Sequence, residues 1–447
     1  MIKDKELLKK VLYIAVPIAL QNLISSSVNF ADVFMIGKLG ETSLAAVGLS
    51  NQITFLLNLL LFGITSGAGV MTAQYWGKKD IFSIKKVLGL ALILSFSCAL
   101  VFFLGARFIP EELLRVYTRD LEVIKLGGRY LKIVSFSYLI WAISFVYALQ
   151  LRALAIAKVT VYSALVSLIV NVFLNYVLIF GKFGFKAYGV EGAAFATAIA
   201  RCFEFLVIIF FVYYKKYPLA AKISELIGFN REFFYKYMKI SLPVILNESI
   251  WALGINSYAM IYARMSTEAV ATVNVVSSIE RIVFVGFIGL ANASGVIIGN
   301  TIGEGKEEKT KEYGKAFEIM AFGLGIIVAI IMAIITIPIL NVYELKVETY
   351  NMAKITLFIL CFILPIKSMN ATTVVGILRG GGDTKYALYI DVAALWLIAV
   401  PLSYFGGLVL GLPVYLVYLL ASSEEFIKLL FGLKRVLSNK WINNVVK

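Results

Sequence analysis

Apolar stretches long enough to cross a lipid bilayer recur along the whole chain, and this feature constrains the fold more than any other. A helix needs about 20 mostly apolar residues to span the hydrocarbon core. The first stretch, residues 11–36, is too long for a secretory signal peptide, and no small-residue cleavage site ends it. With 60% hydrophobic and 15% charged residues, the sequence predicts an all-α integral membrane protein.

Twelve transmembrane helices are expected, and the basic residues indicate their orientation. Most of the 42 Lys and Arg residues fall on the side of the membrane that carries both termini. The positive-inside rule then predicts a multi-pass protein of the inner (plasma) membrane with cytoplasmic N and C termini. The net charge of +15 reflects this orientation and contact with anionic lipid, so no nucleic-acid partner is expected. The predicted helices cover roughly residues 11–36, 44–76, 87–109, 127–151, 160–181, 190–214, 239–264, 270–302, 316–341, 350–378, 386–408 and 411–433.

Several classes of chemistry are excluded by what the sequence lacks. It contains no histidine, which removes the commonest general base and zinc ligand. Its three cysteines lie in predicted helices and suggest no disulfide framework. The glycine-rich segments LRGGGDTK (378–385) and GEGKEEKT (303–310) do not have the P-loop pattern. We therefore expect neither an enzyme nor an ATP-driven pump, and no cofactor.

The chain is predicted to contain one six-helix fold twice. A charged segment, 215–238, separates an N-terminal lobe, 1–214, from a C-terminal lobe, 239–447. Because each lobe has an even number of helices, both lobes start in the cytoplasm, and their pseudo-symmetry axis follows the membrane normal. Parallel repeats that rock around a central site are typical of secondary transporters.

Two alignments of the halves support this repeat. A constant offset of 226 residues aligns proline and glycine positions of the two halves without a gap. In a later segment, an offset of 227 aligns an arginine and a lysine of the two halves. The difference corresponds to one inserted residue. The aligned pairs are Pro17 with Pro243, Gly63 with Gly289, Gly69 with Gly295 and Gly77 with Gly303, then Arg152 with Arg379 and Lys158 with Lys385.

Polar residues inside the spans are the candidate functional residues, because a charge at mid-bilayer costs about 2.5–3.5 kcal/mol on insertion scales. Asp32 lies in the outer part of the first helix. Asn171 and Asn175 are four residues apart and share one face of the fifth helix. Thr197 and, after Gly192, the carbonyl group of Ala193 lie in the sixth helix.

These oxygens suit a weakly bound monovalent cation, and the carboxylate by itself can also carry a proton. The amides favour sodium over a proton, since a titrating carboxylate needs no amide partners. Taken alone, a pair of asparagines at this spacing is more often an interhelical hydrogen-bond clasp than a set of ligands. The sequence alone does not bring these helices together.

The second half has different polar residues. With the offset of 226, Glu248 aligns with Asn22 and Tyr258 aligns with Asp32, so the two lobes are not expected to be chemically equivalent. Aromatic residues of the spans are candidates for lining a substrate cavity, although packing and interfacial belts are the common roles of such residues. The four candidates are Tyr138, Trp141, Phe145 and Trp251.

Four stretches of the sequence together resemble the MATE (multidrug and toxic compound extrusion) family of the MOP superfamily, with members of the DinF and NorM types. They are ADVFMIGKLGETSLAAVGLSNQ, GITSGAGVMTAQYWGKKD, YGVEGAAFATAIAR and LRGGGDTK, with the second-half echo GVIIGNTIGEGK. The likeness covers nearly the whole chain. It implies alternating access by two six-helix lobes, and export of cationic amphiphilic small molecules in exchange for Na⁺ or H⁺.

The resemblance also implies site residues. The family's N-lobe cation site carries over to Asp32, Asn171, Asn175 and Thr197, with Ala193 as a carbonyl ligand. DinF-like members have a second aspartate at the position of Asn175. NorM-like members have an asparagine there, as this chain does. Glu248 matches a NorM-like acid of the seventh helix. Asn370 replaces an aspartate expected in the tenth helix, so a complete C-lobe site is not expected. The second-lobe candidates are Glu248, Tyr258 and Asn370.

Two other functions are compatible with such a chain. A lipid-linked precursor flippase of the same superfamily needs a cation-rich cavity for a pyrophosphate headgroup, and three cations in the spans, Arg201, Arg281 and Lys367, are too few to favour it. A membrane-embedded enzyme needs a nucleophile–base pair or a metal-ligand cluster, and neither is visible. The expected partners are cationic small molecules, the coupling cation and the lipid bilayer, and the expected state is a monomer.

Overall fold

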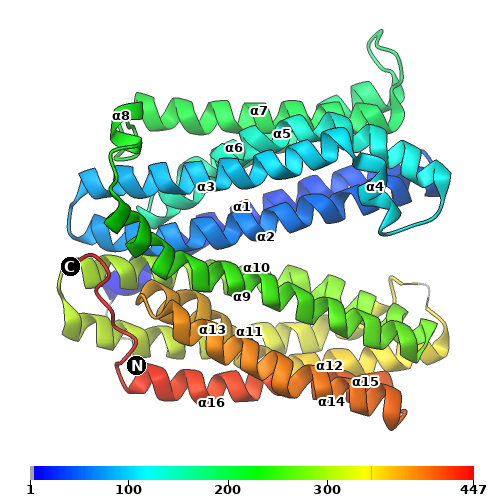
Figure 1. Ribbon diagram of the computed structural model, residues 1–447. Helices are drawn as coiled ribbons and strands as arrows, with labels where there is room; N and C mark the ends of the chain where they lie inside the picture. The colour runs from blue at the N-terminus through cyan, green and yellow to red at the C-terminus, as the bar shows by residue number, and fades with distance from the viewer. Residues whose placement is uncertain (1–4, 344) are drawn as a thin grey trace. The chain divides into compact units, whose positions relative to one another are not determined.

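The computed structural model describes residues 5–343 and 345–447, and this part of the chain is helical without any β-strand (Figure 1). Lower-case α marks α-helices and η marks π-helices. The elements are α1 (Lys5–Gly37), α2 (Glu41–Gly77), α3 (Ile81–Phe108), α4 (Pro110–Arg115), α5 (Leu121–Ala153), α6 (Lys158–Phe180), α7 (Gly189–Tyr214), α8 (Ile223–Leu226), α9 (Arg231–Met265), α10 (Thr267–Gly303), α11 (Glu307–Leu340), α12 (Val347–Ala371), η1 (Thr372–Leu378), α13 (Thr384–Ala393), η2 (Ala394–Ala399), α14 (Val400–Tyr404), η3 (Phe405–Val409), α15 (Val414–Ala421) and α16 (Ser423–Leu437).

The predicted all-α membrane fold is confirmed. Eleven helices of the described chain are long and apolar enough to cross a membrane, and they match the first eleven predicted spans. The twelfth predicted span, 411–433, is divided at Ser422 into α15 and α16. Together these two helices cover residues 414–437, which is about 36 Å at 1.5 Å per residue, enough to cross the bilayer as a broken helix.

Two of the spans contain π-helical turns. η1 continues α12, and η2 and η3 interrupt the span Thr384–Val409 on either side of α14. A π-helical turn takes more residues than an α-helical turn, so it rotates every later side chain around the helix axis. The faces presented by residues 372–409 therefore do not follow a simple 3.6-residue period.

The described chain divides into two compact units. The N unit consists of residues 16–72 and 79–245, and the C unit consists of residues 5–15, 73–78 and 246–447. The divisions fall inside α1, α2 and α9. The predicted lobe boundaries at residues 214 and 239 remain a prediction.

In the N unit, α5 packs against α3 and α7, and α7 packs against α6. The shared core contains Leu57, Leu131 and Tyr138, all fully buried. Side-chain caps begin two of these helices: Asp80 accepts a hydrogen bond from the Ser83 amide at α3 and Asp120 accepts from the amides of the first turn of α5. The helices are therefore held by a continuous apolar core and have defined starts.

In the C unit, α10 packs against α11, α12 and η1. One apolar core joins these helices around Phe287 and Leu357, and a second joins α9, η2 and α15 around Leu395 and Val417. After α16 the chain returns to this body, where Trp441 is fully buried. The C-terminal segment is thus part of the packed unit.

The aligned glycines of the repeat meet each other in the C unit, which contains residues 73–78. A methyl group on Gly77 would collide with the backbone of Asn300, and one on Gly303 would collide with the backbone of Gln74. Asn300 and Gly303 stand 226 residues after Gln74 and Gly77, so the two contacts are related by a local two-fold axis. Of the other span glycines, Gly69 contacts nothing within reach of such a methyl group.

A second pair of contacts repeats inside the two units. In the N unit Arg152 donates from Nη2 to Gln21 Oε1, at 2.5 Å. In the C unit Arg379 Nη2 lies 2.7 Å from Glu248 Oε1. Each arginine follows its partner by the same 131 residues, because 152 − 21 and 379 − 248 are equal. In its contact with the arginine, Glu248 thus takes the place of Gln21, the residue before the Asn22 that the offset of 226 aligns with it.

Prediction for the glycine contact. Gly77→Val and Gly303→Val should each destabilise the protein by about 1–3 kcal/mol, because the new side chain forces two packed helices apart. The measurement is thermal unfolding of the purified protein in detergent. Gly69→Val is the matched control on the same helix and should unfold within error of the parent. Equal effects at positions 69 and 77 would contradict the close contact.

Prediction for the repeated arginine. Arg379→Leu should destabilise the protein by about 3–5 kcal/mol, because it leaves the Glu248 carboxylate without its cation. Adding Glu248→Gln should recover most of this loss, since the pair then resembles the neutral Gln21. Arg152→Leu is the comparison and should cost less, because its hydrogen-bond partner Gln21 is a neutral amide and the carboxylate of Glu204 keeps its interaction with Arg201. Thermal unfolding gives the three values, and no recovery in the double variant would show that the charge is not the cause.

Candidate functional site

Asp32 of α1 and two asparagines of α6 come together in the N unit. Asn175 Nδ2 donates to Asp32 Oδ1 at 2.5 Å and to Asn171 Oδ1 at 3.1 Å. Both asparagine side chains have no exposed surface. The four-residue spacing on α6 places the amides on one face, and that face meets the carboxylate. The predicted ligands from the first and fifth helices are therefore adjacent.

Two oxygens of the candidate residues are buried without a well-formed hydrogen bond to another described residue. They are Asn175 Oδ1, in the Asp32 contact, and Thr197 Oγ1, which interacts with the hydroxyl of Tyr130. Thr197 lies one turn after Ala193 on α7, and both residues face the interior of the N unit. The carbonyl of Ala193 is an ordinary α-helical acceptor with a second lone pair still available. Such oxygens are the donors that a hard monovalent cation requires.

Arg201 is a nearby residue that the sequence analysis did not include in the site. It follows Thr197 by four residues on α7, and its charge interacts with Asp32 and Glu204. The guanidinium carbon lies 3.9 Å from the ring centroid of Trp141, a favourable cation–π geometry. Its Nη1 atom is buried without a hydrogen-bond partner in the described chain. The i, i+4 spacing from Thr197 was the signal that could have found it.

A series of interacting charged side chains continues from Arg201 through the N unit. Glu204 interacts electrostatically with Arg201 and Arg152, and Arg152 in turn binds Gln21 on α1. Two acids and two arginines thus alternate from Asp32 to Arg152. A chain of this kind is close to electroneutral, so each added or removed charge changes the balance of the others.

The predicted cavity aromatics fall into two places. Tyr138 is fully buried and its hydroxyl is 2.9 Å from Thr54 Oγ1. Trp141 and Phe145 pack edge to face with ring centroids 5.8 Å apart. These three lie on α5 of the N unit, whereas Trp251 packs in the core of the C unit around α9 and η2. Their role in binding substrate remains a prediction.

The C unit contains a buried network of ion pairs. Besides the Glu248–Arg379 pair, Lys428 Nζ lies 2.6 Å from Asp391 Oδ1 and 3.2 Å from Glu424 Oε2. Asn247 Nδ2 donates to the other oxygen of Asp391 at 3.1 Å. The sequence analysis missed Lys428 and Glu424. Their i, i+4 spacing on an amphipathic helix was the available signal, but an exposed face explains such spacing equally well.

The second-lobe candidates are not joined to one another. Glu248 pairs with Arg379, Asn370 donates to the Glu425 side chain at 2.7 Å, and Tyr258 donates to the Ala421 carbonyl at 3.4 Å. No hydrogen bond or ion pair within the described ranges connects these three side chains directly. Lys367 forms a further pair with Glu280. Of the three second-lobe candidates, the one acid, Glu248, is thus held by a cation.

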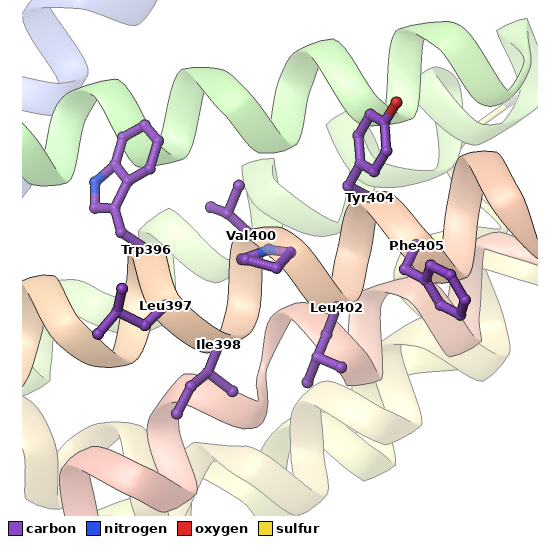
Figure 2. Close-up of a pocket in the computed structure, with 8 residues that line it drawn as sticks. Trp396, Leu397, Ile398, Val400, Leu402, Tyr404 and Phe405 are labelled. Carbon is purple, nitrogen blue, oxygen red and sulfur yellow. The ribbon is translucent and has the colours of Figure 1, made fainter.

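The position that corresponds to the asparagine pair is apolar in the C unit. With the offset of 227, Ile398 and Leu402 stand where the first half has Asn171 and Asn175. Both line an open apolar pocket of about 690 Å³ together with Trp396, Tyr404 and Phe405. Figure 2 shows Trp396 and Tyr404 projecting from the same side of this segment. The asparagine pair of the N unit thus has no polar counterpart here.

The donor set of the Asp32 cluster limits the ions that fit. Within the ranges that the structure describes, no three His, Cys, Asp or Glu side chains form a possible metal-binding group. One carboxylate with amide, hydroxyl and carbonyl oxygens suits an alkali cation better than zinc or another transition metal. The same carboxylate is also the group that would take a proton.

Comparison with known proteins gives one family for the whole chain. The MatE family model matches twice, at residues 17–177 and 243–405, which agrees with an internal duplication. The uncharacterized transporter YisQ of Bacillus subtilis is 25% identical over 418 residues, covering 92% of this chain and 90% of that protein. The probable multidrug resistance protein YoeA of the same organism is 24% identical, covering 87% and 84%.

Solved structures show the same fold. A crystal structure of MATE in a bent conformation has a TM-score of 0.88 at 19% identity, covering 97% of this chain and 96% of that one. An outward-facing multidrug resistance MATE transporter of the MOP superfamily has a TM-score of 0.87 at 20% identity, covering 98% and 99%. The relatives are membrane transporters and not enzymes, as predicted. With its family model matched over most of its length, the chain belongs to the MatE family of multi-pass membrane transporters.

Proposed function

We propose that this protein is a cation-coupled antiporter that exports cationic amphiphilic small molecules by alternating access. Asp32 binds the coupling cation, with Asn171, Asn175, Thr197 and the Ala193 carbonyl as neutral ligands. The observation that carries this proposal is the contact of the Asp32 carboxylate with Asn175, whose own Oδ1 atom is buried and has no hydrogen-bond partner among the described residues. A purely structural clasp would not need that oxygen.

The cluster can exchange a hydrogen bond for a cation. Asn175 donates its amide hydrogen to Asp32, which satisfies an ionised carboxylate. Rotation of the Asn175 side-chain amide by half a turn exchanges the positions of Nδ2 and Oδ1. The two orientations have nearly the same shape and differ only in the hydrogen bonds that they allow. The carboxylate and Oδ1 then both face a bound ion. This exchange favours sodium over a proton, because a protonated carboxyl group needs only one acceptor.

Coupling requires that the cation binds one conformation more tightly than the other. Arg201 provides a physical route, since its charge interacts with both Asp32 and Glu204. A cation at Asp32 cancels the attraction between that carboxylate and Arg201, and it leaves Glu204 as the guanidinium's acidic partner. A small shift of α7 relative to α1 therefore accompanies cation binding.

The relatives support the substrate class only in part. Several are named probable multidrug resistance proteins, among them NorM of Bacillus cereus, which is 25% identical over 404 residues. Export of cationic amphiphiles by this chain is our extension of those names. The proposal also includes an inner (plasma) membrane location, cytoplasmic termini and a monomeric protein.

A lipid-linked precursor flippase is less well supported. A pyrophosphate headgroup needs several unneutralised cations. The spans hold more buried cations than the sequence analysis counted, since Arg379 and Lys428 join Lys367, but each of these three pairs with a carboxylate. Arg281, which was counted, is exposed. The positive charges of these three residues are therefore already neutralised.

Prediction for the carboxylate. Asp32→Asn should leave the protein folded and inserted but lower the affinity for the coupling cation about 10–100-fold, because the only charged ligand of the cluster is lost. Efflux of a cationic dye from cells or vesicles measures the effect. Glu191→Gln is the matched control on α7, since Glu191 is 3.5 Å from Arg129 in an exposed pair. Normal efflux by Asp32→Asn at normal expression would refute the assignment.

Prediction for the coupling ion. In proteoliposomes with equal pH on both sides, an imposed sodium gradient should drive dye transport by the wild type and not by Asp32→Asn. Sodium is expected because the cluster offers neutral oxygens that a proton does not use. The assay records dye fluorescence after the gradient is applied. Transport that follows only an imposed pH gradient would assign proton coupling to Asp32 instead.

A further inference from the structure

Glu318 is a buried acid of the C unit for which the proposed function has no role. It lies on α11, with 6% of its surface exposed, and faces Thr373 of η1. The segment η1 is π-helical, and π-helical turns inside longer helices occur often at functional sites. Glu318 is therefore a titratable side chain in a membrane span that requires an explanation.

Glu318 differs from the other buried acids in having no cationic partner. The described residues contain four buried acids, of which Asp383 pairs with Arg435, while Asp391 and Glu424 pair with Lys428. In the same part of the chain, the only group that interacts with the Glu318 carboxyl is Thr373. An ionised carboxylate without a cation is expensive in such a place.

The nearby cations are all engaged elsewhere or exposed. α11 packs against α10, α12, η1 and α16. On these elements Lys367 pairs with Glu280 and Lys428 pairs with Asp391, while Arg379, just after η1, pairs with Glu248. Arg281 on α10 and Lys315 on α11 are exposed.

The hydrogen bonds of Thr373 indicate the protonation state. Its hydroxyl oxygen is 2.5 Å from Glu318 Oε1 and 2.9 Å from the Met369 carbonyl oxygen. A hydroxyl group has one hydrogen, and the carbonyl can only accept. When Thr373 donates to Met369, its oxygen must accept a hydrogen from Glu318. Both contacts are then full hydrogen bonds, which the protonated acid permits and the ionised acid does not. The other carboxyl oxygen, Oε2, is buried without a hydrogen-bond partner among the described residues, which also favours the neutral form.

We propose that Glu318 is a proton-binding site of the C unit, protonated in the state described here and able to exchange its proton with water. The inference does not depend on the role of Asp32. In the release step the O–H bond of the carboxyl group breaks, the proton passes to a water molecule, and the electron pair stays on the carboxylate. No oxidant, reductant or other reactant is involved.

Thr373 can serve both protonation states. With the acid protonated, its hydroxyl donates to Met369 and accepts from Glu318. With the acid ionised, the hydroxyl rotates and donates to the carboxylate, which provides a hydrogen bond to the charged form. A glutamine at position 318 would offer only the neutral arrangement. Rotation of the Thr373 hydroxyl group therefore allows Glu318 to bind and release its proton reversibly, as a proton carrier requires.

The test compares infrared spectra of wild-type protein and Glu318→Gln in lipid vesicles at neutral pH. The difference spectrum should contain the carbonyl band of a protonated carboxyl group, and this band should move to lower frequency after transfer to heavy water. A difference spectrum with only carboxylate bands would overturn the proposal. A protonated band that does not respond to heavy water would overturn the exchange with water.

Two further variants make the test specific. Glu280→Gln is the matched control, because Glu280 is paired with Lys367, and it should remove carboxylate bands and leave the protonated band in place. Thr373→Val leaves Glu318 unchanged, and it provides a second test if the Glu318→Gln protein does not fold. It removes the hydrogen-bond partner, so the protonated band should shift to higher frequency. An unshifted spectrum in Thr373→Val would also overturn the proposal.

Discussion

The low dielectric constant of the bilayer interior makes an unpaired charge costly, and the polar architecture of this protein follows from that constraint. Several acids of the C unit, buried or half-buried, have cationic partners that come from distant parts of the chain. Glu248 of α9 pairs with Arg379, and Asp391 pairs with Lys428 of α16. Glycine contacts and apolar cores bring the helices together without specifying much register. The pairs fix register, because a one-residue slide would leave buried charges uncompensated.

The duplicated scaffold holds different chemistry at equivalent positions. The Arg152–Gln21 contact of the N unit and the Arg379–Glu248 pair of the C unit occupy the same places in the repeat. Where the N unit has Asn171 and Asn175, the C unit has Ile398 and Leu402. The family model matches both halves, and the two halves differ in the side chains that they place at these positions.

Much of the fold and part of the site could be predicted from the sequence. Long apolar runs identify the spans, because few other folds require them. The four-residue spacing of Asn171 and Asn175 correctly placed both amides on one face. The sequence could not place Arg201 beside Asp32, since they lie on α7 and α1 and only tertiary packing joins them. Nor could it predict the contact of Thr373 with Glu318, because the π-helical turn changes the face of every residue after it.

The partner of each acid determines what that acid can do. A carboxylate held by lysine, as Asp391 is held by Lys428, cannot bind a cation without leaving a second charge buried and unpaired. A carboxylate held by an amide, as Asp32 is held by Asn175, can bind one when the amide turns its oxygen inward. A carboxyl group held by a hydroxyl, as Glu318 is held by Thr373, can take or release a proton when the hydroxyl rotates. On the roles proposed for Asp32 and Glu318, neutral, rotatable partners mark the two acids at which ions exchange, and ion-paired acids belong to the framework that holds them.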